Sequence, residues 1–189
     1  MPEYTREEVV KRVQNGESLE NIDLSSADLS YSNLKNGNFK NANFKNAHLQ
    51  NTNLNGADLS GANLENAFLF GSNLQATNLE NANFSGANLQ DTNLEGANLK
   101  GADLSGLSLF GANLDSANCE GVKLVRTKMK RASLVGTNLK GADLSGAHLQ
   151  RANIRNANLK NAKLHNTNLK YVDLSEANTE GADIKDCNQ

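Results

Sequence analysis

Several residue types are scarce in this chain of 189 residues. There is no tryptophan, proline occurs once as Pro2, and aromatic residues make up 5% of the sequence. The two cysteines, Cys119 and Cys187, do not form a CxxC pair. Their number and spacing predict two free thiols in a reducing compartment.

The sequence also lacks an excess of charge of either sign and any long apolar segment. Nineteen Lys and Arg residues face 21 Asp and Glu residues, a balance that gives no general attraction to nucleic acid or anionic lipid. No apolar run approaches the roughly 18 residues of a membrane span. The segment after Met1 is polar and has no apolar signal core. We therefore expect a cytoplasmic protein without a membrane association.

What the sequence has in abundance is a repeat of five residues. Steps of five from Leu24 to Ile184 give 33 positions, and Leu occupies 25 of them. The residue two before each of these central positions is usually small, and the residue just before is usually Asn or Asp. Gly or Asn often follows two residues after the centre, as at Gly61 and Asn66.

A period of five fits neither regular secondary structure. On an α-helix, five residues advance about 140°, so the leucines would spiral around all sides. On a strand with period two, every second leucine would point to the wrong face. The chain must turn every five residues, and Gly and Asn tolerate the backbone angles of such turns. A coil that turns repeatedly with Leu inside predicts an all-β parallel solenoid.

The motif Ala-(Asp/Asn)-Leu-x-x resembles the repeat of the pentapeptide-repeat protein family. Examples are residues 57–61, Ala-Asp-Leu-Ser-Gly, and residues 97–101, Ala-Asn-Leu-Lys-Gly, and the resemblance covers about residues 22 to 184. It implies a right-handed quadrilateral parallel β-helix with four pentapeptides per coil and about eight coils. Residues 20 apart would then stack on one another. We expect this β-helix over residues 17–189, after an N-terminal capping region at residues 1–16.

The two ends of the chain give different signals. Thr5 to Glu8 reads as a capping box, with Tyr4 and Val9 at the hydrophobic-staple positions, and predicts a helix over residues 6 to 14 that Gly16 terminates. No helix follows the last repeats, so we expect exposed apolar side chains there, at Leu169, Leu174 and Ile184. Either the final residues fold over them, or this end forms a homodimer, as the resemblance implies for some members.

Two substitutions inside the repeat predict a compensation of volume. Leu107 replaces a small inward residue, and Cys119 replaces Leu at the opposite centre of the same expected coil. One side of the core grows while the facing side shrinks, as a close-packed interior requires. No charged neighbour is placed to activate the thiol of Cys119.

Aromatic and arginine residues at outward positions are the candidate binding residues. Phe68, Phe70 and Phe110 fall on one side of the expected rod, and the corner beside them holds Tyr31, Arg131, Arg151 and Tyr171. Phe and Arg are enriched at protein interfaces, so we predict partner binding by Phe68, Phe70, Phe110, Arg131 and Arg151. The basic segment at residues 123–131 indicates either an additional contact with phosphate or an acidic partner, or a solvated surface.

No group of residues indicates a catalytic, cofactor or metal site. His48 and His148 share a column but lie five coils apart, about 24 Å at the usual spacing of strands. There is no Ser-His-Asp group, no glycine-rich phosphate loop and no isolated carboxylate pair. We therefore expect no enzyme, no cofactor, no small-molecule substrate and no direct binding of nucleic acid.

Two functions follow from the family resemblance. The first is a rigid, non-enzymatic scaffold that binds an unknown protein partner through a side face, with a regulatory role like that of cyanobacterial members. The alternative is a DNA mimic that binds DNA gyrase and protects it from quinolones. That role requires a strongly acidic surface, whereas the net charge here is −2.

Overall fold

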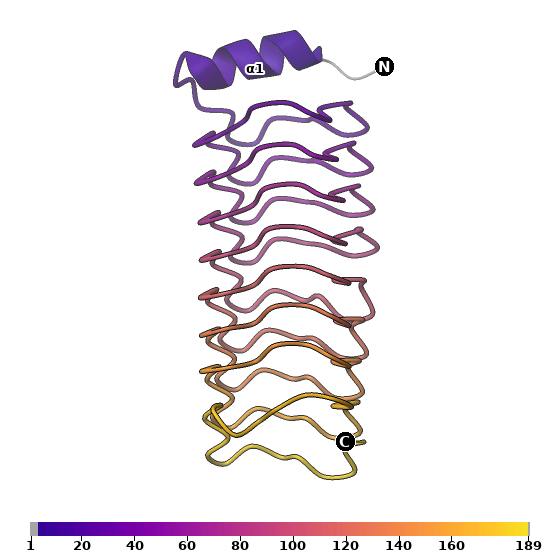
Figure 1. Cartoon of the computed structure of the whole chain (residues 1–189). Coiled ribbons are helices and arrows are strands. Elements are labelled where there is room, and N and C mark those ends of the chain that lie inside the picture. Colours follow the sequence, from indigo (N-terminus) through magenta and orange to yellow (C-terminus); the bar gives the residue numbers. More distant parts are fainter. Residues whose placement is uncertain (1–3, 189) are drawn as a thin grey trace.

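The computed structural model describes residues 4–188, which form one α-helix and a stack of four-sided coils (Figure 1). Helix α1, Arg6–Gln14, lies across the N-terminal end of the stack. No longer strand forms among the described residues, because each side of a coil contributes one bridged residue before the chain turns. The expected solenoid and its N-terminal helix are confirmed. The division into residues 1–16 and 17–189 stays a prediction, and residues 1–3 and 189 lie outside the described chain.

Parallel backbone hydrogen bonds connect residues about 20 apart along the whole rod. Ser18 bridges to Asn38, and the series continues to the bridge from Asn168 to Asn188. Between two successive coils, for example, the amide of Leu24 donates to the carbonyl of Asn43 at 2.8 Å, and the amide of Asn43 donates to the carbonyl of Ile22 at 2.9 Å. Twenty residues per coil correspond to four pentapeptides per coil, as the resemblance implies.

The corners of the coils are turns that need a left-handed residue. The amide of Ala27 donates to the carbonyl of Leu24 at 3.1 Å, and Ser26 between them has a φ of 57°. A positive φ at the third residue of such a turn defines type II. The equivalent position has a positive φ in every pentapeptide from Asn21 to Asp186 except at Glu176. The frequent Gly and Asn of the repeat are therefore explained by turn geometry.

The core is a continuous column of leucines with small residues between them. The central residues from Leu24 to Leu169 are buried, and so are the alanines two positions before them. Where the larger Phe39 replaces Leu, the small residue is Gly37, and a Cβ there would overlap the Phe39 ring. Leu107 and Cys119 are both buried, as a compensation of volume requires.

Several small inward residues are Thr or Ser, and most of their hydroxyls are paired. Thr127 Oγ1 donates to the carbonyl of Leu104 at 2.8 Å, and Thr52, Thr77, Thr137 and Thr167 donate in the same way to a leucine 23 residues earlier. Ser32 differs, because its buried hydroxyl has no partner. Similar positions of the core thus hold a satisfied hydroxyl in one coil and an unsatisfied one in another.

Helix α1 closes the N-terminal end as the sequence predicts. The amide of Glu8 donates to Thr5 Oγ1 at 3.2 Å, and the amide of Thr5 donates to Glu8 Oε2 at 2.7 Å, which completes the capping box. Val9 is fully buried against the first coil. Gly16, with a φ of 70°, follows the C-cap residue Asn15 and terminates the helix in a Schellman motif. No helix among residues 4–188 is long and apolar enough to cross a membrane.

The C-terminal end is less regular and only partly covered. The expected exposure of Leu169 is wrong, because the end of the chain continues the coil and Leu169 donates to the carbonyl of Asn188 at 2.7 Å. Leu174 is half-buried and Ile184 is 46% exposed, so these two remain accessible. The last coil also departs from the pattern near Glu176. The amide of Asn156 donates to the carbonyl of Glu176, whereas the pattern of the other coils would pair it with the carbonyl of Ser175.

The buried hydroxyls generate a prediction about stability. Thr127→Val removes a buried hydrogen bond at nearly constant volume, so the free energy of unfolding should fall by about 1 kcal/mol. Ser32→Ala removes a hydroxyl without a partner and should leave the free energy unchanged or raise it. Urea unfolding followed by circular dichroism measures both variants. Equal losses from the two substitutions would contradict the assigned hydrogen bonding.

Candidate interaction surface

One side of the rod carries the three exposed phenylalanines, and we call this side the aromatic face. His48 bridges to Phe68 and Phe68 to Asn88, which places them on successive coils. The amide of Gly71 donates to the carbonyl of Gln90, and the amide of Asp91 donates to the carbonyl of Phe110. Phe70, Gln90 and Phe110 therefore form one column, as predicted from the sequence.

Exposed apolar side chains concentrate on the aromatic face. Six large hydrophobic residues among residues 4–188 are exposed, and five lie on this face or at its corner: Tyr31, Phe68, Phe70, Phe110 and Tyr171. The sixth, Ile184, belongs to the open C-terminal coil. The phenylalanines are 37 to 43% exposed, so part of each side chain remains available for contact. The aromatic face is thus the most apolar side surface of an otherwise polar rod.

A histidine extends the aromatic surface toward the N-terminus. The ring centroids of His48 and Phe68 lie 4.9 Å apart, with the rings inclined by 30°. This distance is typical of offset aromatic packing, in which each ring restricts the other. Phe68 is therefore supported in its exposed position by a residue that the sequence indicated only as an isolated histidine.

The corner beside the aromatic face holds large residues in an unfavourable backbone conformation. Arg131, Arg151 and Tyr171 have φ values of 62°, 60° and 64°, and Tyr31 has 59°. The left-handed conformation costs an L residue with a large side chain about 1 kcal/mol, a cost that glycine avoids. Gly111 occupies the same corner column one coil before Arg131. Because every corner of the rod needs this conformation, what distinguishes this corner is the large size of the side chains that it displays.

One arginine at this corner, Arg151, also contacts a neighbouring ring. The guanidinium carbon of Arg151 lies 5.4 Å from the centroid of the Tyr171 ring, and Lys170 Nζ lies 5.2 Å from the same centroid. Both distances fall in the range of cation–π interactions. Tyr171 is 68% exposed, so much of its side chain is accessible to a partner.

The basic segment at residues 123–131 is divided among two sides of the rod. Leu124, Thr127 and Met129 point into the core and are fully buried. Lys123 lies on the preceding side, where its Nζ is 3.6 Å from Asp103 Oδ2. Lys128 and Lys130 project from the aromatic face, and the segment therefore presents part of its charge next to Phe110.

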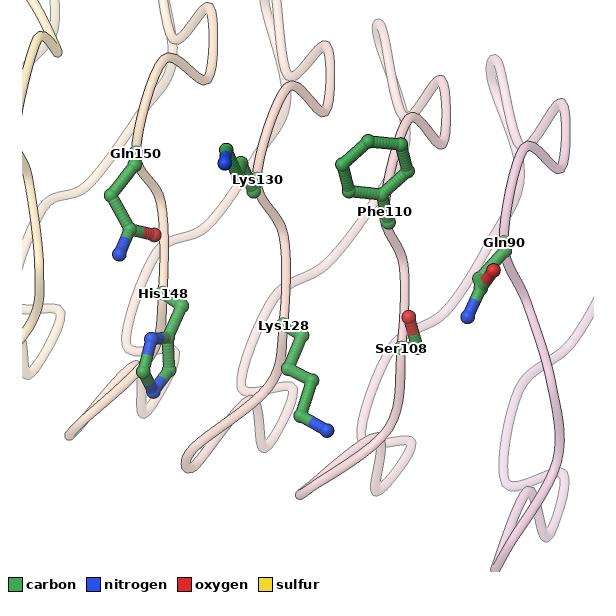
Figure 2. A pocket seen from close by; sticks show the side chains of 7 residues that line it. All are labelled: Gln90, Ser108, Phe110, Lys128, Lys130, His148 and Gln150. Atoms are coloured by element: carbon green, nitrogen blue, oxygen red, sulfur yellow. The ribbon is translucent and has the colours of Figure 1, made fainter.

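A shallow groove of about 460 Å³ runs across the coils at this place. Figure 2 shows its lining, which comes from four successive coils and consists of Gln90, Ser108, Phe110, Lys128, Lys130, His148 and Gln150. Phe110 and Lys130 stand next to each other on neighbouring coils (Figure 2). The groove combines an aromatic ring, two cations and uncharged hydrogen-bonding groups. Ser108 was not selected from the sequence, Lys128 entered only as part of the basic segment at residues 123–131, and His148 entered only as an isolated histidine.

The other sides of the rod are polar and internally paired. On the side opposite the aromatic face, Glu120 forms two ion pairs. Its carboxylate oxygens lie 3.8 Å from Lys100 Nζ and 3.4 Å from Lys140 Nζ. Asn98 and Asn118 belong to a ladder of side-chain amides on the same side, joined at 3.0 Å. Polar groups that satisfy one another in this way have little need of a partner. Among residues 4–188, no three His, Cys, Asp or Glu side chains are grouped to hold a metal ion.

A model of pentapeptide repeats matches the chain in overlapping segments that run from residue 15 to residue 188. The chain belongs to the pentapeptide-repeat family. Its fold is the right-handed quadrilateral β-helix that the repeat motif implies, so this expectation is confirmed. No curated protein of similar sequence was found.

Solved structures similar to this pentapeptide-repeat protein come from the same family. HetL, involved in heterocyst differentiation regulation in the cyanobacterium Nostoc sp. strain PCC 7120, is 28% identical over 98% of this chain and 94% of its own, with a TM-score of 0.37. Alr5209 from Nostoc PCC 7120 is 34% identical over 53% and 83%, with a TM-score of 0.47. QnrB1, a plasmid-mediated fluoroquinolone resistance protein, is 24% identical over 87% and 78%, with a TM-score of 0.43.

The two thiols of this pentapeptide-repeat protein differ in environment. Cys119 is completely buried in the core, and desolvation raises the pKa of its thiol to about 12. Cys187 is half-buried near the C-terminal end, and its Sγ lies 3.0 Å from the carbonyl of Leu164. Burial also raises the pKa of Cys187. Neither environment favours the thiolate.

We expect the two cysteines to react at very different rates. At pH 8, a thiol reagent such as iodoacetamide should modify Cys187 in the native protein and reach Cys119 only after unfolding in denaturant. Peptide mass spectrometry after timed labelling measures each site. Cys187→Ser serves as the control, since it should abolish native labelling. Rapid labelling of Cys119 in the folded protein would show that the core opens at that coil.

Proposed function

We propose that this pentapeptide-repeat protein is a non-enzymatic, regulatory scaffold that binds a protein partner through its aromatic face. The observation that carries the proposal is the gathering of five of the six exposed large hydrophobic residues on this face and its corner. Exposed aromatic rings beside arginine are typical of the centre of a protein interface. The predicted binding residues are Phe68, Phe70, Phe110, Arg131 and Arg151.

The rigidity of the rod supports a scaffold role. Backbone hydrogen bonds hold each coil to its neighbours, so the aromatic face keeps its shape and a partner need not order it. The absence of a nucleophile with a base in the sequence favours binding over catalysis. Two unpaired cysteines favour a reducing compartment, and we place the protein in the cytoplasm.

The charge distribution argues against a DNA mimic as the main function. A mimic needs a continuous acidic surface, but the carboxylates on the side opposite the aromatic face alternate with lysines. Lys160 Nζ lies 2.9 Å from Glu180 Oε1, and Glu120 is paired with two lysines. The negative potential of this side is therefore locally neutralised. We keep protection of DNA gyrase from quinolones as the alternative, which a supercoiling assay tests directly.

The scaffold proposal predicts a loss of partner binding when the rings are removed. The triple variant Phe68→Ser, Phe70→Ser and Phe110→Ser should lose the partner that the wild type captures from a lysate of the source organism. Buried aromatic anchors in interfaces contribute about 2 kcal/mol or more each, so the loss should be nearly complete. Capture followed by mass spectrometry identifies the partner, and circular dichroism verifies the fold.

The matched control changes three residues on the opposite side, with Lys40→Ser, Glu80→Ser and Lys100→Ser. This variant should retain the partner. If both triple variants bind equally well, the aromatic face is not the binding surface. If the wild type captures nothing specific, the scaffold proposal itself is contradicted.

We infer in addition that the C-terminal coil pairs two copies of the chain. Leu174 and Ile184 remain accessible in the C-terminal coil of the described residues, and the regular pairing of this coil is interrupted near Glu176. An open edge of parallel β-structure favours association with a second edge. The N-terminal end differs because helix α1 covers it.

The paired state should depend on the two apolar residues. Leu174→Lys combined with Ile184→Lys places charges on the open end and should convert a dimer into a monomer, because the charges would have to be desolvated and would repel one another. Light scattering coupled to size exclusion measures the mass. Lys40→Ser and Glu80→Ser are the control and should not alter it. A monomeric wild type at high concentration would overturn the inference.

A further inference from the structure

Positive charges without an ion-pair partner concentrate on the part of the aromatic face that begins at Phe110. Of the 19 Lys and Arg residues, nine form an ion pair within residues 4–188 and ten do not. Six of these ten lie in three successive coils, on the aromatic face and its two corners. We call them the basic surface: Arg126, Lys128, Lys130, Arg131, Arg151 and Lys170. All six are exposed.

The same part of the face has no carboxylates. From Ser108 to Tyr171, its outward and corner positions hold no Asp or Glu, and the acids that flank this stretch are Asp91 on the N-terminal side and Asp186 one coil beyond it. On the adjoining sides, Asp143 Oδ2 lies 3.9 Å from Lys163 Nζ, and Glu176 Oε2 lies 3.6 Å from Arg155 Nε. These carboxylates are therefore engaged with other cations. The basic surface has no internal compensation, although the net charge of the chain is −2.

One coil carries most of this charge across its whole width. Arg126 and Arg131 occupy its two corners, and Lys128 and Lys130 lie between them. Neighbouring cations on one coil lie within the Debye length of about 8 Å at physiological salt, so they act on an anion together. Both arginines hold the left-handed conformation, with φ of 55° and 62°, where glycine would fit more easily.

We propose that the basic surface binds an acidic, extended segment of a protein partner, with an apolar side chain of that segment against Phe110. The inference rests on the proposed scaffold function and specifies the chemistry of its partner. Carboxylates would pair with the lysines and arginines, while Phe110 and the uncharged groups of the groove, Gln90, Ser108 and Gln150, would contact the apolar side chain and the peptide backbone (Figure 2).

The dimensions favour a peptide over a nucleic acid. The cations extend over three coils, which span about 10 Å along the rod at the usual strand spacing. This length reaches about three phosphates of one strand, whereas proteins that bind duplex DNA through its backbone commonly make about 6–10 phosphate contacts. An exposed phenylalanine beside the cations also suits an acidic segment that carries an apolar residue.

A defined probe tests the inference. The probe is a fluorescein-labelled peptide of alternating glutamate and serine with one central phenylalanine, measured by fluorescence anisotropy at low ionic strength. The wild type should bind it, and Lys128→Gln with Lys130→Gln and Arg131→Gln should weaken binding about tenfold or more. The control variant, Lys100→Gln with Lys140→Gln and Lys160→Gln, has the same net charge and should bind as the wild type does.

Three outcomes would overturn the inference. In the first, the wild type does not bind the acidic peptide. In the second, the two charge variants lose affinity for the peptide equally. In the third, the wild type binds a short duplex DNA more tightly than the peptide. A version of the peptide with glutamine in place of glutamate must also bind more weakly. Phe110→Ser should reduce affinity for the peptide with phenylalanine and leave affinity for a peptide with serine at that position unchanged.

The failure of this inference is distinguishable from that of the scaffold function. In the lysate capture, loss of the partner from the phenylalanine variant alone would keep the scaffold function and reject an acidic partner segment. Loss from both the phenylalanine and the basic-surface variants supports both proposals. Retention by both variants rejects both.

Discussion

The hydrogen bonds between backbone groups about 20 residues apart hold the rest of this structure in place. They fix the number of pentapeptides per coil, and they place every residue directly over its equivalent in the preceding coil. The leucine column of the core follows from this register, because each central side chain then meets another at the same depth. A single coil could not bury these leucines, so the register and the core stabilise each other.

The same register determines what the surface can do. Side chains that are far apart in the sequence, such as Phe70 and Phe110, form a column because the coils do not slip. Loops do not interrupt the described coils, so binding groups must be displayed on flat sides and corners rather than enclosed in a deep pocket. Association with a macromolecule therefore suits this fold better than chemistry on a small substrate. The strained arginines at the corner show where the chain departs from the residues that the turn prefers.

Much of this architecture could be predicted from the sequence because a strict period leaves few alternatives. The capping helix and the inward leucines follow from local patterns, and the column of Phe70 with Phe110 follows from the four pentapeptides per coil that the family resemblance implies. The burial of Leu169 could not, since it depends on how the last residues continue the coil. The basic surface was also missed as a unit, because Lys128 and Lys170 are separated in the sequence and only the ion pairs of the other lysines show which charges remain unpaired.

Site-specific photo-crosslinking tests most directly whether the aromatic face is a binding surface. A photoreactive phenylalanine analogue would replace Phe110 in one protein and Glu120, on the opposite side, in another. After irradiation in a lysate of the source organism, the account predicts a crosslink to a distinct protein from position 110 and none to that protein from position 120. The same crosslinked proteins from both positions would contradict it.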